Sequence, residues 1–228
     1  MVRTDRNIMK IEGQHPRFIY ITGCDGTGKS TQTSLLLSHL RGKGIQTQHV
    51  WLRFPFFLSV PFLVYARFRG YSWYEKVGNV RHGYWDFRRS TILRLLLPWT
   101  LLFDAAFAGF FKIYLPMWCG TTIVCERFVL DMLVDLAVAG VISGFQLQPP
   151  VNLYLKLLPK NAMILILTLD YADTVRQRRP DLKSDWQLEK RLDAFRLLAE
   201  QLGYPMISSQ PSIKEVAHQI LRIVECAS

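Results

Sequence analysis

The stretch Gly23-Cys24-Asp25-Gly26-Thr27-Gly28-Lys29-Ser30-Thr31 constrains this chain more than any other part of its sequence. It fits the pattern Gly-x4-Gly-Lys-[Ser/Thr] at every fixed position. The preceding apolar run, residues 17–22, predicts a buried strand, and residues 30–41 predict a helix. Between a strand and a helix, such a loop points its backbone N–H groups at a phosphate, and the helix N-terminus adds positive charge. The context disfavours a chance match, so the sequence predicts a nucleotide-phosphate site.

The residue types within residues 23–31 indicate what each position does. Glycines allow phosphate oxygens to approach the backbone closely, because they carry no Cβ. Lys29 is expected to reach the β- and γ-phosphates, and the Ser30 hydroxyl is expected to bind Mg²⁺. We therefore expect ATP and Mg²⁺ as ligands of this loop.

Composition limits the class of protein. A chain of 228 residues is long enough for one α/β domain with a buried core and short for two. The formal charge of +10 would attract nucleotides, nucleic acid or an anionic membrane, or it is only a basic soluble surface. We expect no nucleic-acid partner, because the basic residues are dispersed and no nucleic-acid-binding module is recognisable. The four cysteines lack zinc or CxxC spacing, which predicts reduced thiols and a cytoplasmic protein without a signal peptide.

Further strands are predicted at residues 46–52, 121–125, 162–169 and 204–208, with helical segments between them. This alternation predicts the three-layer α/β fold of P-loop NTPases, in which helices flank a parallel sheet. Residues 70–83 read as a surface loop. Residues 88–118 read as helical, with a kink or a new start at Pro98.

Two apolar segments, residues 54–66 and 92–118, raise the question of membrane contact. Prolines interrupt the first, and Arg94, Asp104 and Lys112 interrupt the second, so a transmembrane span is disfavoured. A buried helix is the default interpretation of each segment. Weak contact with a membrane surface and a homodimer interface remain open alternatives.

Charged residues follow several of the predicted strands, at the edge where ligands bind in parallel α/β folds. Arg53 and Arg127 would grip an acceptor that itself carries a phosphate, or each forms a salt bridge with a neighbouring acid. Glu126 would order Mg²⁺-bound water near the phosphates, or it pairs with an arginine.

Three arginines, Arg176, Arg178 and Arg179, precede Pro180. Cations this close repel one another unless an anion joins them. They predict a lid, at about residues 176–188, that closes over the transferred phosphoryl group. The alternative is a solvated basic helix end stabilised by the helix dipole.

Together these residues resemble the thymidylate kinase family of nucleoside monophosphate kinases, from about Phe18 to Leu221. The resemblance rests on Asp25 within the phosphate loop and on three further segments. These are Arg53-Phe54-Pro55, Glu126-Arg127-Phe128, and the strand that ends at Leu169-Asp170 before Arg176.

The resemblance implies one kinase domain over residues 1–228, which transfers the ATP γ-phosphoryl group to a nucleoside monophosphate, dTMP to dTDP. It implies that Asp25, Arg53 and Arg127 bind the acceptor, that Ser30 and Glu126 serve the metal, and that Lys29 and the lid arginines are catalytic. Family members are commonly dimers.

The chain departs from the family pattern at three positions. Glu126 stands for an aspartate, Phe128 for a tyrosine or histidine, and Phe107 for an arginine that helps to recognise the acceptor. Two alternatives therefore stay open. One is a paralogue that phosphorylates another nucleotide or small molecule, and the other is a nucleotide-binding regulatory or membrane-surface protein with little turnover.

Overall fold

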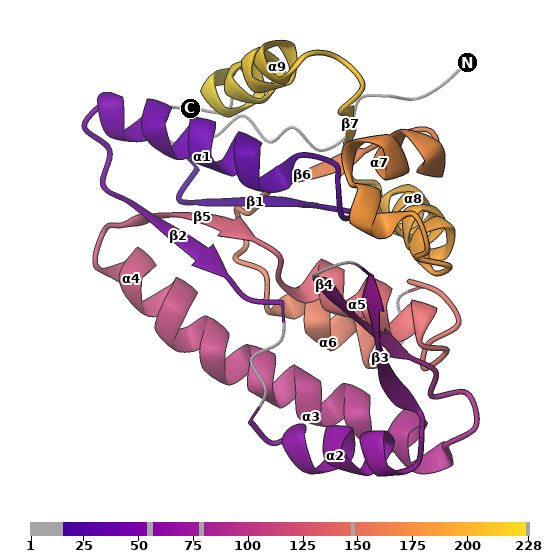
Figure 1. The fold of residues 1–228 in the computed structure, drawn as a ribbon. Coiled ribbons are helices and arrows are strands. Elements are labelled where there is room, and N and C mark those ends of the chain that lie inside the picture. The colour runs from indigo at the N-terminus through magenta and orange to yellow at the C-terminus, as the bar shows by residue number, and fades with distance from the viewer. Residues whose placement is uncertain (1–15, 54–56, 78–79, 147–148, 227–228) are drawn as a thin grey trace.

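The computed structural model describes residues 16–53, 57–77, 80–146 and 149–226, and its centre is a parallel five-stranded sheet (Figure 1). The strand order is β2-β5-β1-β6-β7. The strands are β1 (Phe18–Gly23), β2 (Thr47–Trp51), β5 (Thr122–Glu126), β6 (Met163–Thr168) and β7 (Met206–Ser208). The expected strands are therefore confirmed. β1 lies in the middle, paired with β5 on one side and β6 on the other.

Helices cover both faces of this sheet (Figure 1). One face carries α1 (Lys29–Gly42) and α9 (Ile213–Cys226), and the other carries α3 (Thr91–Gly109), α5 (Val129–Val138), α6 (Val151–Lys156) and α8 (Leu188–Leu202). The side chains of β1 alternate accordingly. Ile19 and Ile21 pack toward α1 and α9, while Phe18 and Tyr20 pack toward α3 and α5. The three-layer α/β fold predicted from the sequence is confirmed.

The long connection from β2 to β5 contains a feature that the sequence analysis missed. After α2 (Val60–Phe68), residues 72–77 (β3) and 80–85 (β4) form an antiparallel hairpin, so the surface loop expected at 70–83 is wrong. The hairpin is stabilised by an aromatic stack, in which Trp73 lies 5.9 Å from Tyr84 across the strands and 6.4 Å from Trp186. Because Trp186 lies far along the chain, local sequence gives little sign of this hairpin.

A single helical rod follows the hairpin. It consists of α3, a π-helical turn (η1, Phe110–Tyr114) and α4 (Leu115–Trp118). Pro98 lies inside α3, so a new helix start at this proline is wrong. Leu97 and Leu101 are fully buried on either side of it, and this packing offsets the backbone hydrogen bond that proline cannot donate. The Pro98 carbonyl accepts a 2.7 Å hydrogen bond from the Tyr154 hydroxyl.

The rod is buried on one side only, which corrects the expectation of a buried helix for residues 92–118. The same holds for α2, whose only buried residue is Ala66. Within the described residues, the segment Thr91–Trp118 is the one helix long and apolar enough to cross a membrane, and 39% of its most apolar window is buried. A core helix of a soluble protein passes this test too, so the finding is weak evidence for a span.

Candidate active site

The glycine-rich loop connects β1 to α1 at the carboxyl edge of the sheet, as its sequence pattern requires. Its backbone wraps around the Cys24 carbonyl, which accepts hydrogen bonds from Lys29 Nζ at 2.6 Å and Thr27 Oγ1 at 2.8 Å. Gly28 has a φ of 82°, and the space that its missing Cβ would occupy is open. This open space beside the N-terminus of α1 suits a phosphate oxygen.

Lys29 is buried, and its surroundings lower the pKa of its amine. Burial lowers the pKa of the Lys29 amine to about 8, and repulsion from Arg127 adds to this effect while Asp25 opposes it. The Lys29 side chain donates to a neutral carbonyl rather than to a carboxylate. Burial raises the pKa of the Cys24 thiol to about 12, so this thiol stays protonated at neutral pH. Lys29 is therefore the titrating cation of the loop near neutral pH.

Two oxygen groups suited to a divalent cation lie beside the loop. Ser30 Oγ donates a 2.7 Å hydrogen bond to Glu126 Oε1, and His49 Nε2 lies 3.7 Å from Glu126 Oε2. Hydroxyl and carboxylate oxygens fit Mg²⁺, which usually completes its shell with water and substrate phosphates. The described residues contain no group of three or more His, Cys, Asp and Glu that could hold a metal alone. The pair fits a magnesium ion that a triphosphate helps to bind.

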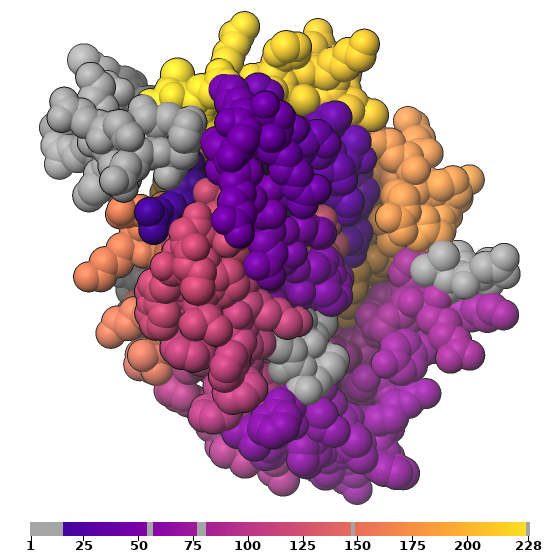
Figure 2. All heavy atoms as spheres, turned by 90° about the vertical axis from the view of Figure 1, so that its left-hand side faces the viewer, coloured from indigo at the N-terminus to yellow at the C-terminus, as the bar shows by residue number. Residues whose placement is uncertain are grey.

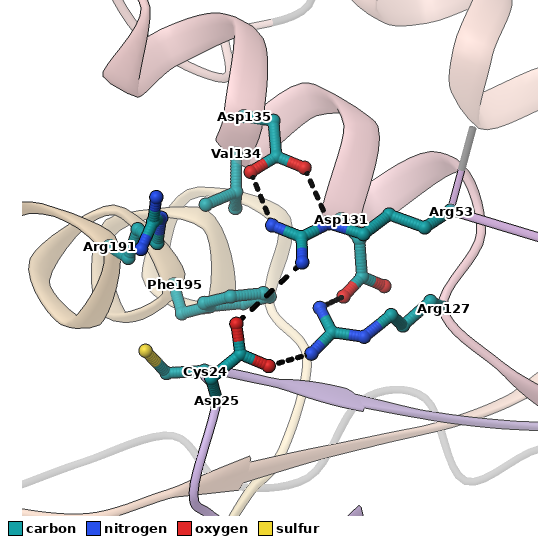
Figure 3. Close-up of a pocket in the computed structure, with 9 residues that line it drawn as sticks. All are labelled: Cys24, Asp25, Arg53, Arg127, Asp131, Val134, Asp135, Arg191 and Phe195. Atoms are coloured by element: carbon teal, nitrogen blue, oxygen red, sulfur yellow. Dashed lines mark hydrogen bonds and ion pairs between the residues drawn. The ribbon is translucent and has the colours of Figure 1, made fainter. Parts of the chain in front are cut away.

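Asp25, Arg53 and Arg127 meet in one cluster next to the loop (Figure 3). Arg127 forms an ion pair with Asp25, and Arg53 Nη1 lies 3.6 Å from Asp25 Oδ2. Arg53 also binds Asp135 in a bidentate way, at 3.0 and 2.9 Å. The three residues converge as predicted. The alternative of salt bridges to neighbouring acids also describes what is seen, because both arginines are paired with aspartates.

The cluster is closed and strongly polarised. The cavity that it lines has a volume of about 10 Å³, which is room for about one water molecule. Burial alone would raise the pKa of Asp25, but Arg127, Lys29 and Arg53 together hold it well below its usual range. Asp25 is thus ionised throughout the physiological range, and it competes with any other anion for Arg53 and Arg127.

The backbone at Arg127 is strained in a way that supports a binding role. Its φ of 65° is the one positive value for a non-glycine residue in the described ranges. Such conformations cost about 1–3 kcal/mol and persist only where the surroundings hold them. Here the Arg127 carbonyl accepts a 3.0 Å hydrogen bond from the Leu52 N–H. The kink turns the Arg127 side chain away from β5 and toward the loop.

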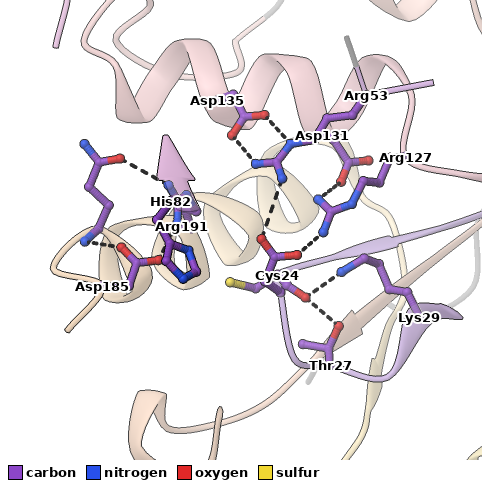
Figure 4. Close-up of polar contacts among 12 residues, drawn as sticks. Cys24, Thr27, Lys29, Arg53, His82, Arg127, Asp131, Asp135, Asp185 and Arg191 are labelled. Carbon is purple, nitrogen blue, oxygen red and sulfur yellow. Dashed lines mark hydrogen bonds and ion pairs between the residues drawn. The ribbon is translucent and has the colours of Figure 1, made fainter. Parts of the chain in front are cut away.

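Sequence reasoning missed three charged residues of this cavity, namely Asp131, Asp135 and Arg191. A signal for the two acids existed, since Asp131 and Asp135 lie four residues apart in the predicted helix that follows Arg127, which places both on one side of it. Asp131 is 1% exposed and accepts hydrogen bonds from Tyr20 Oη at 2.6 Å and Thr22 Oγ1 at 2.7 Å. Arg191 pairs with Asp185 at 2.6 Å (Figure 4). Nothing in the sequence distinguishes it from the other cations of α8.

The lid arginines do not converge in this structure. They lie at the end of α7 (Ala172–Arg178) and before the short 3-10 turn Pro180–Leu182. Arg176 pairs with Asp173 and Glu189, at 2.9 and 3.1 Å, and lines a surface cavity of about 290 Å³. Arg178 donates to the Ser209 carbonyl at 2.8 Å. Arg179 pairs with Asp181 and lies beside the loop, its Cγ 3.5 Å from where a Cβ on Gly26 would stand.

The positions that depart from the family pattern have distinct surroundings. The Phe107 ring is half exposed and stacks on Phe57, with 6.0 Å between centroids and 11° between planes. Phe128 is fully buried with its ring against Tyr20, so it does not line the cavity. Phe54 and Pro55 lie outside the described residues.

Comparison with known proteins adds one likeness. No protein-family model and no curated protein sequence matches the chain. Among solved structures, the fold is similar to that of thymidylate kinase from Ehrlichia chaffeensis, with 17% identity and a TM-score of 0.47. The similar region covers 91% of this chain and 97% of that one. A likeness at this level concerns the fold at most, and it defines neither reaction nor substrate.

Proposed function

We propose that this protein is an ATP-dependent nucleoside monophosphate kinase that acts on dTMP, with one kinase domain over residues 1–228 and a lid at about 176–188. The observation that carries the proposal is the junction at Cys24-Asp25. Cys24 belongs to the loop that suits a triphosphate, and Asp25 holds the two arginines that suit a second phosphate. Two phosphate sites that share one junction fit a phosphoryl transfer between two nucleotides.

Each residue has a defined task in this mechanism. Residues 23–31 would hold the ATP phosphates, and Lys29 would balance the charge of the β- and γ-phosphates. Ser30 and Glu126 would hold Mg²⁺, which supplies charge neutralisation at the phosphates. Arg53 and Arg127 would exchange their aspartate partners for the acceptor phosphate and aim its oxygen at the γ-phosphorus. Asp25, once released, would face the sugar of the acceptor.

The decisive test is an ADP-release assay with Mg·ATP and a panel of nucleoside monophosphates. We expect turnover with dTMP, and none in the Lys29→Ala variant used as the blank. Turnover with no member of the panel, while ATP still binds, would contradict the proposal and favour a nucleotide-binding regulatory protein.

One observation favours a second acceptor class. Phe107 and Phe57 form an apolar stack at the position where the resemblance leads us to expect a phosphate- or base-binding arginine. An apolar pair cannot donate a hydrogen bond to a thymine or a phosphate. A paralogous kinase with a different nucleotide or small molecule as acceptor would not need this arginine. In the same assay, turnover with such an acceptor and not with dTMP would identify this class.

The lid arginines give a sharper prediction than the sequence allowed. Of the three, Arg179 lies beside the phosphate loop, so Arg179→Ala should lower kcat about 10- to 100-fold with little change in ATP affinity. Arg176→Ala is the matched control, because Arg176 pairs with acids at the outer cavity. Steady-state kinetics of both variants would measure the difference. An unchanged kcat in Arg179→Ala would return Arg179 to an ordinary surface pair with Asp181, and equal losses in both variants would show that Arg179 is not the distinctive lid arginine.

A further inference from the structure

The rod of residues 91–118 exposes a continuous apolar stripe. We call this the outer stripe, and its members recur three or four residues apart along the whole rod. They are Ile92, Leu95, Leu96, Trp99, Phe103, Phe107, Phe110, Phe111, Leu115 and Trp118, and each is between 43% and 67% exposed. On the neighbouring α2, Val64 and Phe68 are 47% and 87% exposed. The segment that contains α2, in purple, and the end of the rod, in pink, are both visible in the view of Figure 2, and the Phe57 ring stacks on Phe107 of the stripe.

The outer stripe is large for a soluble monomer. Its six aromatic rings, each about half exposed, present on the order of 600 Å² together, given about 200 Å² for a whole ring. That value already reaches the upper end of the largest apolar patch on a typical monomer, before the aliphatic members are included. A surface of this size and continuity is an interaction surface.

The exposed charges carried by α2 and the rod have one sign. Within α2 and the rod, the exposed charged residues are Arg67, Arg94 and Lys112, and all are cations. The acid of these elements, Asp104, is 1% exposed. Its carboxylate accepts hydrogen bonds from the Phe57, Leu58 and Ser59 N–H groups and from Ser59 Oγ, so it points at the start of α2. Arg69, Arg88 and Arg89, next to these helices, are exposed as well.

The rod cannot cross a bilayer without dismantling the core. Leu93, Leu97, Leu101 and Ala105 on its inner side are fully buried against the rest of the protein. The outer stripe can enter only the outer part of a bilayer, with the rod parallel to the surface. Trp99 and Trp118 suit that depth, because indole rings favour the membrane interface.

We propose that the outer stripe, together with α2, docks this protein on the surface of an anionic lipid bilayer. The apolar side chains would enter the boundary between headgroups and acyl chains, and the surrounding arginines and lysines would attract the lipid phosphates. This surface goes beyond the kinase activity and does not depend on it.

A second copy of the chain is the other candidate occupant, and charge disfavours it. An isologous contact presents the same patch from both sides. Cations would then surround the contact on both partners, with no exposed carboxylate from α2 or the rod to pair with them. The net charge of +10 adds long-range repulsion between copies and attraction to an anionic membrane.

Flotation with vesicles tests the proposal on the full-length protein. We expect binding to vesicles of phosphatidylcholine with phosphatidylglycerol at about 0.1 M salt and much weaker binding to phosphatidylcholine alone. The double substitution Phe103→Gln with Phe110→Gln should reduce the partition coefficient about tenfold or more, because it removes apolar area from the centre of the stripe. The matched control is Leu197→Gln with Ile213→Gln, two exposed apolar residues on other helices, and it should change binding less than twofold.

Two readouts keep the outcome clear. Thermal unfolding shows whether each double variant is folded. Brominated lipids should quench the fluorescence of Trp99 and Trp118 in the unmodified protein, and Trp99→Phe should reduce this quenching. The proposal is overturned if the wild-type chain fails to float with anionic vesicles, or if both double variants lose binding equally. It is also overturned if the chain is a stable dimer that Phe103→Gln with Phe110→Gln dissociates, without vesicle binding.

Discussion

Replacing Lys29 with alanine is expected to lower kcat by about a thousandfold or more, because it removes the cation that, in the proposed mechanism, faces the transferred group. The fold should survive. The pKa of Lys29 is lowered to about 8 from its usual 10.5, so the protonated side chain costs stability in the folded protein below about pH 8. That cost fades as the pH rises from 8 toward 10.5. At pH 7 the alanine variant should therefore unfold at a temperature no lower than the parent, as calorimetry would measure.

A matched variant, Lys29→Arg, separates the effect of the side chain's charge on ATP binding from the effect of its shape. ATP binding favours protonated Lys29, so above about pH 8 the lysine must take up a proton on binding, and affinity should fall about tenfold per pH unit. Arginine stays charged and should lose this dependence. Isothermal titration at several pH values would compare the two. Near-normal turnover of Lys29→Ala with any acceptor would remove Lys29 from the mechanism.

Substituting Asp131 with alanine is the second change for which we expect a large effect, this time on stability. The Asp131 carboxylate is buried and accepts hydrogen bonds from Tyr20 and Thr22 on β1 and from the Phe128 N–H, and it pairs with Arg127. Its removal leaves the buried Tyr20 and Thr22 hydroxyls without this acceptor and takes one of two carboxylates from Arg127, which keeps Asp25. The free energy of unfolding should fall by about 3–5 kcal/mol, as urea denaturation would measure.

Two control variants accompany this measurement. Asp131→Asn keeps one oxygen acceptor without the charge and should lose less stability than alanine. Asp193→Ala removes an exposed partner of Arg196 and should have an effect within the error of the measurement. If Asp131→Ala is no less stable than Asp193→Ala, then Asp131 does not hold this part of the core together.

The strands and the loop could be predicted because their signals are local. An apolar run followed by a glycine-rich pattern defines β1 and α1 whatever the rest of the chain does. The β3–β4 hairpin is different. Trp73 and Tyr84 are held in place by Trp186, which belongs to the segment before α8. A contact with such a distant residue produces no periodic pattern of apolar residues in the local sequence.

The candidate site could be predicted in part, for a similar reason. Asp25, Arg53 and Arg127 each follow a strand or lie in the loop, so the parallel sheet alone brings them to one edge. The acids that pair with these arginines, Asp131 and Asp135, lie on α5. Whether Arg53 binds Asp135 or a ligand depends on side-chain geometry, which the sequence does not show. The sequence does not distinguish the lid arginines from one another. In the structure each binds a different partner, because Arg176 and Arg178 lie on α7 and Arg179 lies between α7 and the 3-10 turn.

The closed cluster around Asp25 has a consequence for selectivity. Carboxylates already occupy the arginines, so every incoming anion competes with an internal rival that is always present at high local concentration. A small anion such as inorganic phosphate would have few contacts with which to compete against Asp25, Asp131 and Asp135. A larger ligand can offset the free energy of displacing the aspartates through contacts that its other groups make with the protein. If the cluster binds the acceptor phosphate as proposed, its ion pairs would make occupancy by the free phosphate of a cell unfavourable.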